Sequence, residues 1–288
     1  MYRRSITIKE DWSARENYIV FEGVNSAFYL YINGVKVGYS QGSHMPAEFN
    51  ISPYVSVGEN ELVVKVLKWC DGSYLEDQDF FRLSGIFRDV YLLSRSKVHI
   101  KDMDIKTDLR TLSGQVITNL EATISRNDIE IWASLYDGNQ LLDKKQVIGG
   151  VFSFTLDNPN NWSAETPYLY TLVLKMQEEY ITKKIGFRTI EVSELGELLI
   201  NGVSVKLKGV NHHDTHPLKG HVMSSEDIIK DLVTMKRLNI NTIRTSHYPS
   251  WSVILEVTLK IAGKVLLVLK IKIRYILSVW IMLTIALI

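Results

Sequence analysis

Two short stretches of this 288-residue chain gather side chains that could do chemistry. The first is an acidic block, Asp71–Asp79, which places several carboxylates close together. The second is the histidine-rich stretch Gly209–Pro217, and it is followed by a further histidine within Arg244–Pro249. Carboxylates and imidazoles bind hydroxyl groups, ligate metals and act as general acids or bases. These stretches therefore supply the candidate functional residues, and the question becomes which elements position them.

The first 95 residues carry short alternating strands separated by turn residues. Phe28–Ile32 and Val35–Tyr39 flank Asn33-Gly34, a pair that readily adopts the positive φ angles of a type I′ turn. We expect a hairpin here and further strands over 61–67 and 88–93. Strands with no helix between them predict a β-sandwich or jelly roll over residues 1–95.

A second all-β stretch is expected over residues 96–190. Ile129–Tyr136 alternates with period two, and Asp137-Gly138 is expected to turn the chain back. Later strands are expected over 168–174 and 182–187. Roughly 95 residues of such strands fit an immunoglobulin-like sandwich. Periodicity alone leaves one large β domain open as the alternative.

A strand–helix–strand unit is expected over residues 191–250. A hairpin over 198–207 comes first, and Ser224 with Asp227 then forms the capping box that begins a helix. A strand over 241–246 follows, which is the opening of a parallel α/β unit. His213 and His247 then fall at or just past two strand ends, the edge where such folds bind ligands.

The segment from 251 to 288 differs in composition from the rest. It holds one acid, Glu256, five Lys or Arg, and no Asp, Asn, His or Pro. Its apolar run over 275–288 is shorter than the roughly 18 residues of a membrane span. Two interpretations stay open, a membrane-associating segment and an out-of-frame translation never selected to fold. The second is favoured, because the change falls inside a motif-bearing unit.

The net charge and composition of the chain indicate which partners and which cellular location to expect. The net charge is +1 and no Lys/Arg face is visible before residue 250, so we expect no nucleic-acid partner. A membrane partner is not expected either. The single cysteine, Cys70, excludes an internal disulfide, and no apolar signal region follows Met1. A cytoplasmic location is therefore expected.

The two blocks, together with Gly23–Phe28, Ser84–Asp89 and Trp162–Tyr170, resemble β-galactosidases of glycoside hydrolase family 2. The resemblance implies a jelly-roll sugar-binding domain over 1–95, an immunoglobulin-like domain over 96–190, and the start of a truncated TIM (β/α)8 barrel over 191–250. It also implies that the family's opening segment lies before Met1, so that the first domain is incomplete. The related β-glucuronidases share the histidine-bearing strands but not the acidic block, which favours a galactoside substrate.

The resemblance assigns roles to three residues. His213 and His247 match histidines that hydrogen-bond galactose hydroxyls, and Asp79 matches an acid that contacts the sugar's 6-hydroxyl and a sodium ion. Without the family, a histidine at a strand end is more often structural, and an acidic block is more often a solvated loop. Asp71 and Arg88 are expected to hold that loop in place.

Three further histidines are interpreted as loop residues, with a three-histidine metal site as the weak alternative. They are His212, His216 and His221.

Catalysis in this family needs groups that the sequence does not provide. Retaining glycosidases use two carboxyls about 5 Å apart. The resemblance implies that both are glutamates on later barrel strands, beside a magnesium site. A barrel needs at least about 200 residues, whereas only 98 remain from Glu191 onward (288 − 190 = 98). We therefore expect a truncated family member that is inactive alone.

The alternatives are a non-catalytic galactoside-binding module, one part of a split enzyme, and a membrane-attached protein that uses residues 251–288. Full-length relatives of this family form homo-oligomers, and the state of this chain is left open.

Overall fold

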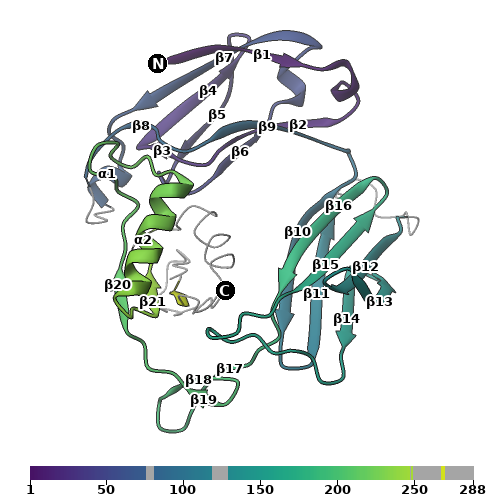
Figure 1. Ribbon diagram of the computed structural model, residues 1–288. Helices are drawn as coiled ribbons and strands as arrows, with labels where there is room; N and C mark the ends of the chain where they lie inside the picture. Colours follow the sequence, from purple (N-terminus) through teal and green to yellow (C-terminus); the bar gives the residue numbers. More distant parts are fainter. Residues whose placement is uncertain (76–80, 119–128, 247, 249–266, 270–288) are drawn as a thin grey trace. The chain divides into compact units, whose positions relative to one another are not determined.

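The computed structural model describes residues 1–75, 81–118, 129–246, 248 and 267–269. The described residues fall into two compact units. The first unit combines residues 1–95 with the described residues from 208 onward, and the second contains the described residues of 96–207. Strands dominate both units (Figure 1).

The first unit begins with a β-sandwich. Its two main sheets have the strand orders β1-β7-β4-β5 and β6-β2-β9, and a short β3-β8 pair accompanies them. Buried apolar side chains, among them Ile19, Phe21, Phe28 and Leu30, form one core between the sheets. The strands are β1 (Tyr2–Ile8), β2 (Glu16–Phe21), β3 (Val24–Asn25), β4 (Ala27–Ile32), β5 (Val35–Gln41), β6 (Ala47–Asn50), β7 (Gly58–Leu67), β8 (Gly85–Ile86) and β9 (Val90–Arg95). Short helical turns are Glu10–Trp12, Ser52–Tyr54 and α1 (Gly72–Leu75).

The β4–β5 hairpin confirms the turn predicted from Asn33-Gly34. Ile32 pairs with Val35, so the loop consists of Asn33 and Gly34 alone. Asn33 has a φ of 49° and Gly34 a φ of 79°, the left-handed values that a type I′ turn requires. Local turn chemistry therefore sets the register of this hairpin.

The second unit is another β-sandwich with its own core. Its sheets have the orders β10-β11-β14 and β13-β12-β15-β16, with a small β17-β18-β19 sheet beyond them. Leu112, Leu135, Phe154 and Leu172 are among the buried residues between the sheets. The two separate cores favour two β domains over one large domain. The strands are β10 (Ile100–Thr107), β11 (Thr111–Thr118), β12 (Ile131–Asp137), β13 (Gln140–Gln146), β14 (Val151–Thr155), β15 (Tyr170–Met176), β16 (Glu179–Ile185), β17 (Ile190–Val192), β18 (Leu198–Ile200) and β19 (Val203–Ser204).

The turn between β12 and β13 lies one residue later than predicted. Asp137 still pairs with Gln140, so the loop is Gly138-Asn139 and not Asp137-Gly138. Gly138 takes a φ of 55°, which glycine adopts without strain. The glycine therefore occupies the first loop position, and the aspartate remains in the strand.

The first unit also contains a short parallel α/β segment. Strands β20 (Gly209–Asn211), β21 (Thr242–Arg244) and β22 (Leu267–Leu269) pair in parallel, and α2 (Ser225–Arg237) connects the first two. The capping box predicted from Ser224 and Asp227 is confirmed, since each side chain bonds the other's backbone N–H. Ile228 and Leu232 on α2 are buried.

Two details of this region differ from the sequence-based predictions. The hairpin strand expected to continue to Leu207 ends at Ser204, and the parallel strand begins only at Gly209. Leu267–Leu269, within the segment of foreign composition, pairs with β21 and so continues the sheet. All other residues of the segment 251–288, for which a membrane-associating or an out-of-frame segment was predicted, lie outside the described residues. Among the described residues, no helix is both long and apolar enough to cross a membrane.

Candidate functional site

An ion pair joins the sandwich of the first unit to the end of strand β20. The Nη2 atom of Arg88, just before β9, donates to Oδ2 of Asp214 at 3.1 Å. The two side chains are only 8% and 3% exposed. Burial lowers the pKa of the Arg88 guanidinium and the carboxylate of Asp214 opposes that shift, so arginine stays charged at neutral pH. The pair therefore fixes the chain after β20 against the sandwich.

Arg88 also holds two backbone groups of the sandwich. Its Nη1 atom donates to the carbonyl oxygens of His44, at 3.2 Å, and Glu22, at 3.4 Å. The guanidinium of Arg88 thus connects two loops of the sandwich to Asp214. Its several N–H donors, held in a fixed planar arrangement, allow it to bond all three groups at once.

The candidate ligand residue His213 is held by a tyrosine. The Tyr248 hydroxyl lies 3.0 Å from Nδ1 of His213, and the same oxygen accepts the backbone N–H of Asp214 at 3.1 Å. Tyr248 is 5% exposed. Burial, with the Asp214 charge as the second cause, raises the pKa of Tyr248 to about 12, so the phenol is neutral at neutral pH. His213 itself is half-buried and is the second residue after the end of β20.

His44 is a member of this cluster that the sequence did not identify. Its ring stacks on Tyr248 with centroids 3.9 Å apart and an interplanar angle of 20°. Burial, followed by the Arg88 charge, lowers the pKa of His44 to about 2, so this imidazole is neutral at neutral pH. His44 stands alone in its loop without a motif around it, which is why no local pattern marked it.

His212 and His221 lie outside helices and strands, as the interpretation as loop histidines predicted, but they are not solvent-exposed loop residues. Both are buried. His212 places Nε2 3.0 Å from Oδ2 of Asp231 on α2 and Nδ1 3.7 Å from Oδ1 of Asp214. Burial lowers the pKa of His221, whose ring lies 5.8 Å from that of His44. Both histidines therefore belong to the packed layer around Asp214.

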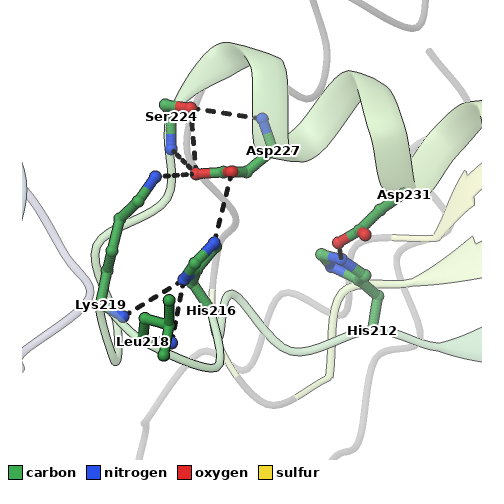
Figure 2. Close-up of polar contacts among 7 residues, drawn as sticks. All are labelled: His212, His216, Leu218, Lys219, Ser224, Asp227 and Asp231. Atoms are coloured by element: carbon green, nitrogen blue, oxygen red, sulfur yellow. Dashed lines mark hydrogen bonds and ion pairs between the residues drawn. The ribbon is translucent and has the colours of Figure 1, made fainter.

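His216 has the loop role that was predicted for it. Its Nδ1 atom accepts the backbone N–H groups of Leu218 and Lys219, at 3.1 and 3.2 Å. Its Nε2 atom lies 3.6 Å from the carboxylate of Asp227 at the start of α2 (Figure 2). Lys219 Nζ donates to the same carboxylate at 2.7 Å. These contacts shape the loop and stabilise the start of the helix.

The described residues do not fit a metal centre. Within residues 1–75, 81–118, 129–246, 248 and 267–269, no three His, Cys, Asp or Glu side chains come together as ligands. A site made by His212, His216 and His221 is therefore not formed.

The described part of the acidic block folds back on the sandwich. Ser73 Oγ donates to Ser26 Oγ at 3.1 Å, and Arg82 Nη1 donates to the carbonyl of Ser73. Nearby, Asn25 is buried with Oδ1 accepting from Ser26 and Ser43, and its Nδ2 has no partner among the described residues. Asn25 is thus a polar group that the sequence did not single out.

Of the three predicted site residues, the structure describes His213. Asp79 and His247 both lie outside the described residues. Their roles, and the roles of Asp71 and Arg88 in holding the loop, stay predictions. The structure adds that Arg88 bonds Asp214, a role that was not predicted.

A cavity lies elsewhere in the first unit. It has a volume of about 580 Å³ and is lined by residues of β1, β2, β7, β8 and β9, such as Ile6, Phe21 and Tyr91. None of the histidines above lines it. Its lining residues include no Asp, Glu or His, so we place the candidate site in the chain after β20 instead.

Along the chain, a first sandwich is followed by a second sandwich and then by a short parallel α/β segment. Three sequence models of the glycosyl hydrolases family 2 match consecutive parts of the chain. They are the sugar binding domain over residues 1–96, the family 2 model over 98–188 and the TIM barrel domain over 190–263. The chain belongs to glycosyl hydrolase family 2, as its motifs predicted.

Curated relatives of similar sequence are named β-galactosidases. The one from Pectobacterium atrosepticum is 42% identical across 86% of this chain, and the one from Staphylococcus xylosus is 42% identical across 89%. The relative from Psychromonas ingrahamii is 38% identical across 87%. In each case the chain spans 26% of the relative's length.

Solved structures that resemble the chain include β-glucuronidases. The enzyme from Ruminococcus gnavus superposes with a TM-score of 0.82 at 22% identity, over 93% of this chain and 49% of that structure. An uncultured Clostridium β-glucuronidase gives 0.79 at 24% identity, over 93% and 48%. At this identity the likeness establishes the fold: a jelly-roll sugar-binding domain, an immunoglobulin-like domain and the start of a TIM barrel.

Proposed function

We propose that this chain carries the galactoside-recognising part of a family 2 β-galactosidase, an enzyme that hydrolyses terminal β-D-galactosides such as lactose with retention. The observation that supports this is the identity of 38–42% to proteins named β-galactosidase, over 86–87% of the chain. It favours a galactoside over a glucuronide, since the β-glucuronidases share less than 25% identity.

His213, His247 and Asp79 are the residues proposed to contact the sugar. The position of His213 supports its role, because substrate contacts in (β/α)8 barrels come from the carboxyl ends of the strands and His213 follows β20. Its ring is also held by Tyr248, which limits the conformations that a ligand would otherwise have to fix.

The 288-residue chain is proposed not to hydrolyse galactosides alone. Retention requires a nucleophilic carboxylate and an acid/base carboxyl about 5 Å apart. The resemblance places both on barrel strands beyond the three that the structure describes. Among the described residues, no group of three His, Cys, Asp or Glu side chains could hold a metal ion, so the proposal includes no step through a metal. A sodium ion at Asp79 remains a proposal from the resemblance.

Binding can be tested separately from hydrolysis. The ¹⁵N-labelled chain is titrated with methyl β-D-galactoside and, in parallel, with methyl β-D-glucuronide. We expect the galactoside to shift the imidazole signals of His213 and the glucuronide to leave them unchanged. A His213→Ala variant should weaken binding, whereas His99→Gln, a histidine change in the second unit, should not. Equal responses to both sugars, or none, would contradict the proposal.

A second candidate is one part of a two-chain enzyme. It is favoured by the parallel sheet β20-β21-β22, because the described residues supply three of the eight parallel strands of a barrel. Here the partner would be a chain that supplies the remaining barrel strands. Mixing the two purified chains should then restore galactoside hydrolysis, which neither shows alone.

We also propose a cellular location and a state of assembly for the chain. The single cysteine, Cys70, supports a reducing cytoplasm. We propose no nucleic-acid and no membrane partner, since the net charge is +1. A homo-oligomer is proposed from the resemblance to full-length relatives.

A further inference from the structure

The first sandwich is open along one side, where its two main sheets end in strands β1 and β9 (Figure 1). The cavity of about 580 Å³ lies on this side, because residues of both strands line it together with residues of their neighbours β7 and β2. The lining includes Ile19, Phe21 and Val64, which are only 1–2% exposed. The apolar core of the sandwich thus forms part of the cavity wall.

Strand β9 has a free edge that lacks the usual protection. It pairs with β2 over its whole length without a bulge, and among the described residues no strand pairs with its other edge. Edge strands are normally protected from pairing by charged residues, proline or bulges. Residues 90–94 contain no charged residue and no proline, and Val90 and Tyr91 are 38% and 43% exposed. The backbone N–H and C=O groups on this edge are therefore available to another strand.

The charged residues that line the cavity are both cationic. Arg3 and Arg4 line it, and no Asp or Glu does. Arg3 is paired with Glu61 at 3.4 Å. Alternation along β1 places Arg4 on the same face as Ile6 and Ile8, which pack towards the core. Arg4 makes no ion pair within the part of the chain that the structure describes. An occupant that carries a carboxylate would therefore complement the charge of the cavity.

These features favour a polypeptide strand of a different chain as the occupant. A strand pairs with the free N–H and C=O groups of β9 and places alternate side chains in the cavity, whereas an apolar small molecule leaves those backbone groups unpaired. A second copy of this chain offers its own β1 or β9, and neither of these strands contains an acid to pair with Arg4.

We propose that the open side of the first sandwich binds an extended strand of a partner protein. This strand pairs with the free edge of β9, packs apolar side chains against Ile19 and Phe21, and places a carboxylate beside Arg4. Backbone hydrogen bonds provide the affinity, and the alternate side chains provide the specificity. The inference does not rest on the proposed function, because no histidine of the candidate site lines the cavity.

The probes are short synthetic peptides in which valine and threonine alternate, with a single glutamate at each valine position in turn. They are added to the full ¹⁵N-labelled chain. We expect at least one of them to bind, to shift the amide signals of residues 90–94 and to slow hydrogen exchange there. Replacing its glutamate by glutamine should weaken binding by about two- to fivefold, and Arg4→Gln should remove this difference. Arg3→Gln is the matched control and should retain it, since Arg3 is paired with Glu61.

A further version of the bound peptide tests the strand pairing itself. N-methyl groups on all of its amides prevent pairing along either edge but leave the side chains unchanged, so this version should not bind. Equal binding of the methylated peptide would overturn the proposal, as would no binding by any peptide of the set or amide shifts confined to other strands. Self-association of the chain that protects the amides of residues 90–94 without peptide would assign the edge to a second copy and would also overturn it.

Discussion

The Arg88–Asp214 pair gives a quantitative prediction about how the sandwich and the strand β20 are joined. We consider Arg88→Met, Asp214→Leu and the double variant. Each single change leaves the other charge buried without its partner, because both side chains are less than one-tenth exposed. Removing one member of such a pair costs about 3–5 kcal/mol in free energy of unfolding.

The double variant should be less destabilised than the sum of the single changes. Removing both charges also removes the desolvation penalty, and a buried ion pair replaced by apolar residues is often close to neutral. Arg88 has additional bonds to the carbonyls of His44 and Glu22, so some loss remains. We expect a coupling energy of at least about 2 kcal/mol between the two sites.

The assay is urea unfolding followed by methyl NMR signals. Ile243 of β21 reports on the first unit, and Leu135 reports on the second unit as an internal reference. Separate signals are needed, because a chain with two cores need not unfold in one step. Arg3→Met is the matched control, since Arg3 pairs with Glu61 on the surface, with 67% and 45% of the side chains exposed. It should cost no more than about 1 kcal/mol.

The reasoning is refuted if Arg88→Met or Asp214→Leu costs no more than Arg3→Met. It is also refuted if the losses in free energy of unfolding from the two changes are additive, because additivity would mean that the charges of Arg88 and Asp214 do not interact.

Three further predictions concern other parts of the chain. Ser224→Ala removes the cap of α2 and should cost about 1 kcal/mol in the first unit, measured by the same urea titration; no loss would show that the cap is dispensable. Hydrogen bonds from Lys219 and Ser224 hold the pKa of Asp227 well below its ordinary value. Stability from this carboxylate is present above its unfolded pKa of about 3.9 and lost as pH falls below that value. In Asp227→Asn, the free energy of unfolding should depend less on pH under acid conditions than in the unaltered protein. An unchanged pH dependence would contradict the assignment. The pKa of His44 is lowered to about 2, so the unfolded chain binds a proton there from about pH 6.5 downward and the folded chain does not. Stability of the first unit should therefore fall with decreasing pH below 6.5, and less so in His44→Phe; equal slopes in the two proteins would refute this.

Features that are set by neighbouring residues were predictable from the sequence. The Asn33-Gly34 turn and the Ser224–Asp227 capping box are local, and both are confirmed. Local chemistry was less decisive at Asp137-Gly138, where a shift of one residue satisfies the same glycine preference. The family resemblance provided the order of the domains, which periodicity alone left open.

The contacts that form the candidate site were beyond local reasoning. Arg88 and Asp214 are 126 residues apart in sequence, and nothing in the spacing of either motif pairs them. The burial of His44 and His221 likewise follows from the packing of a sandwich loop against the chain after β20. His213 was identified from its motif, but its hydrogen bond to Tyr248 required the structure.

The central proposal is that this chain binds a galactoside and does not hydrolyse it alone. The most direct measurement is the release of nitrophenol from a chromogenic β-galactoside by the purified 288-residue chain, alongside a chain with His213→Ala. We predict no release above the buffer rate from either protein. Turnover that purifies with the chain and is abolished by His213→Ala would contradict the claim, since it would place a complete catalytic site within these residues.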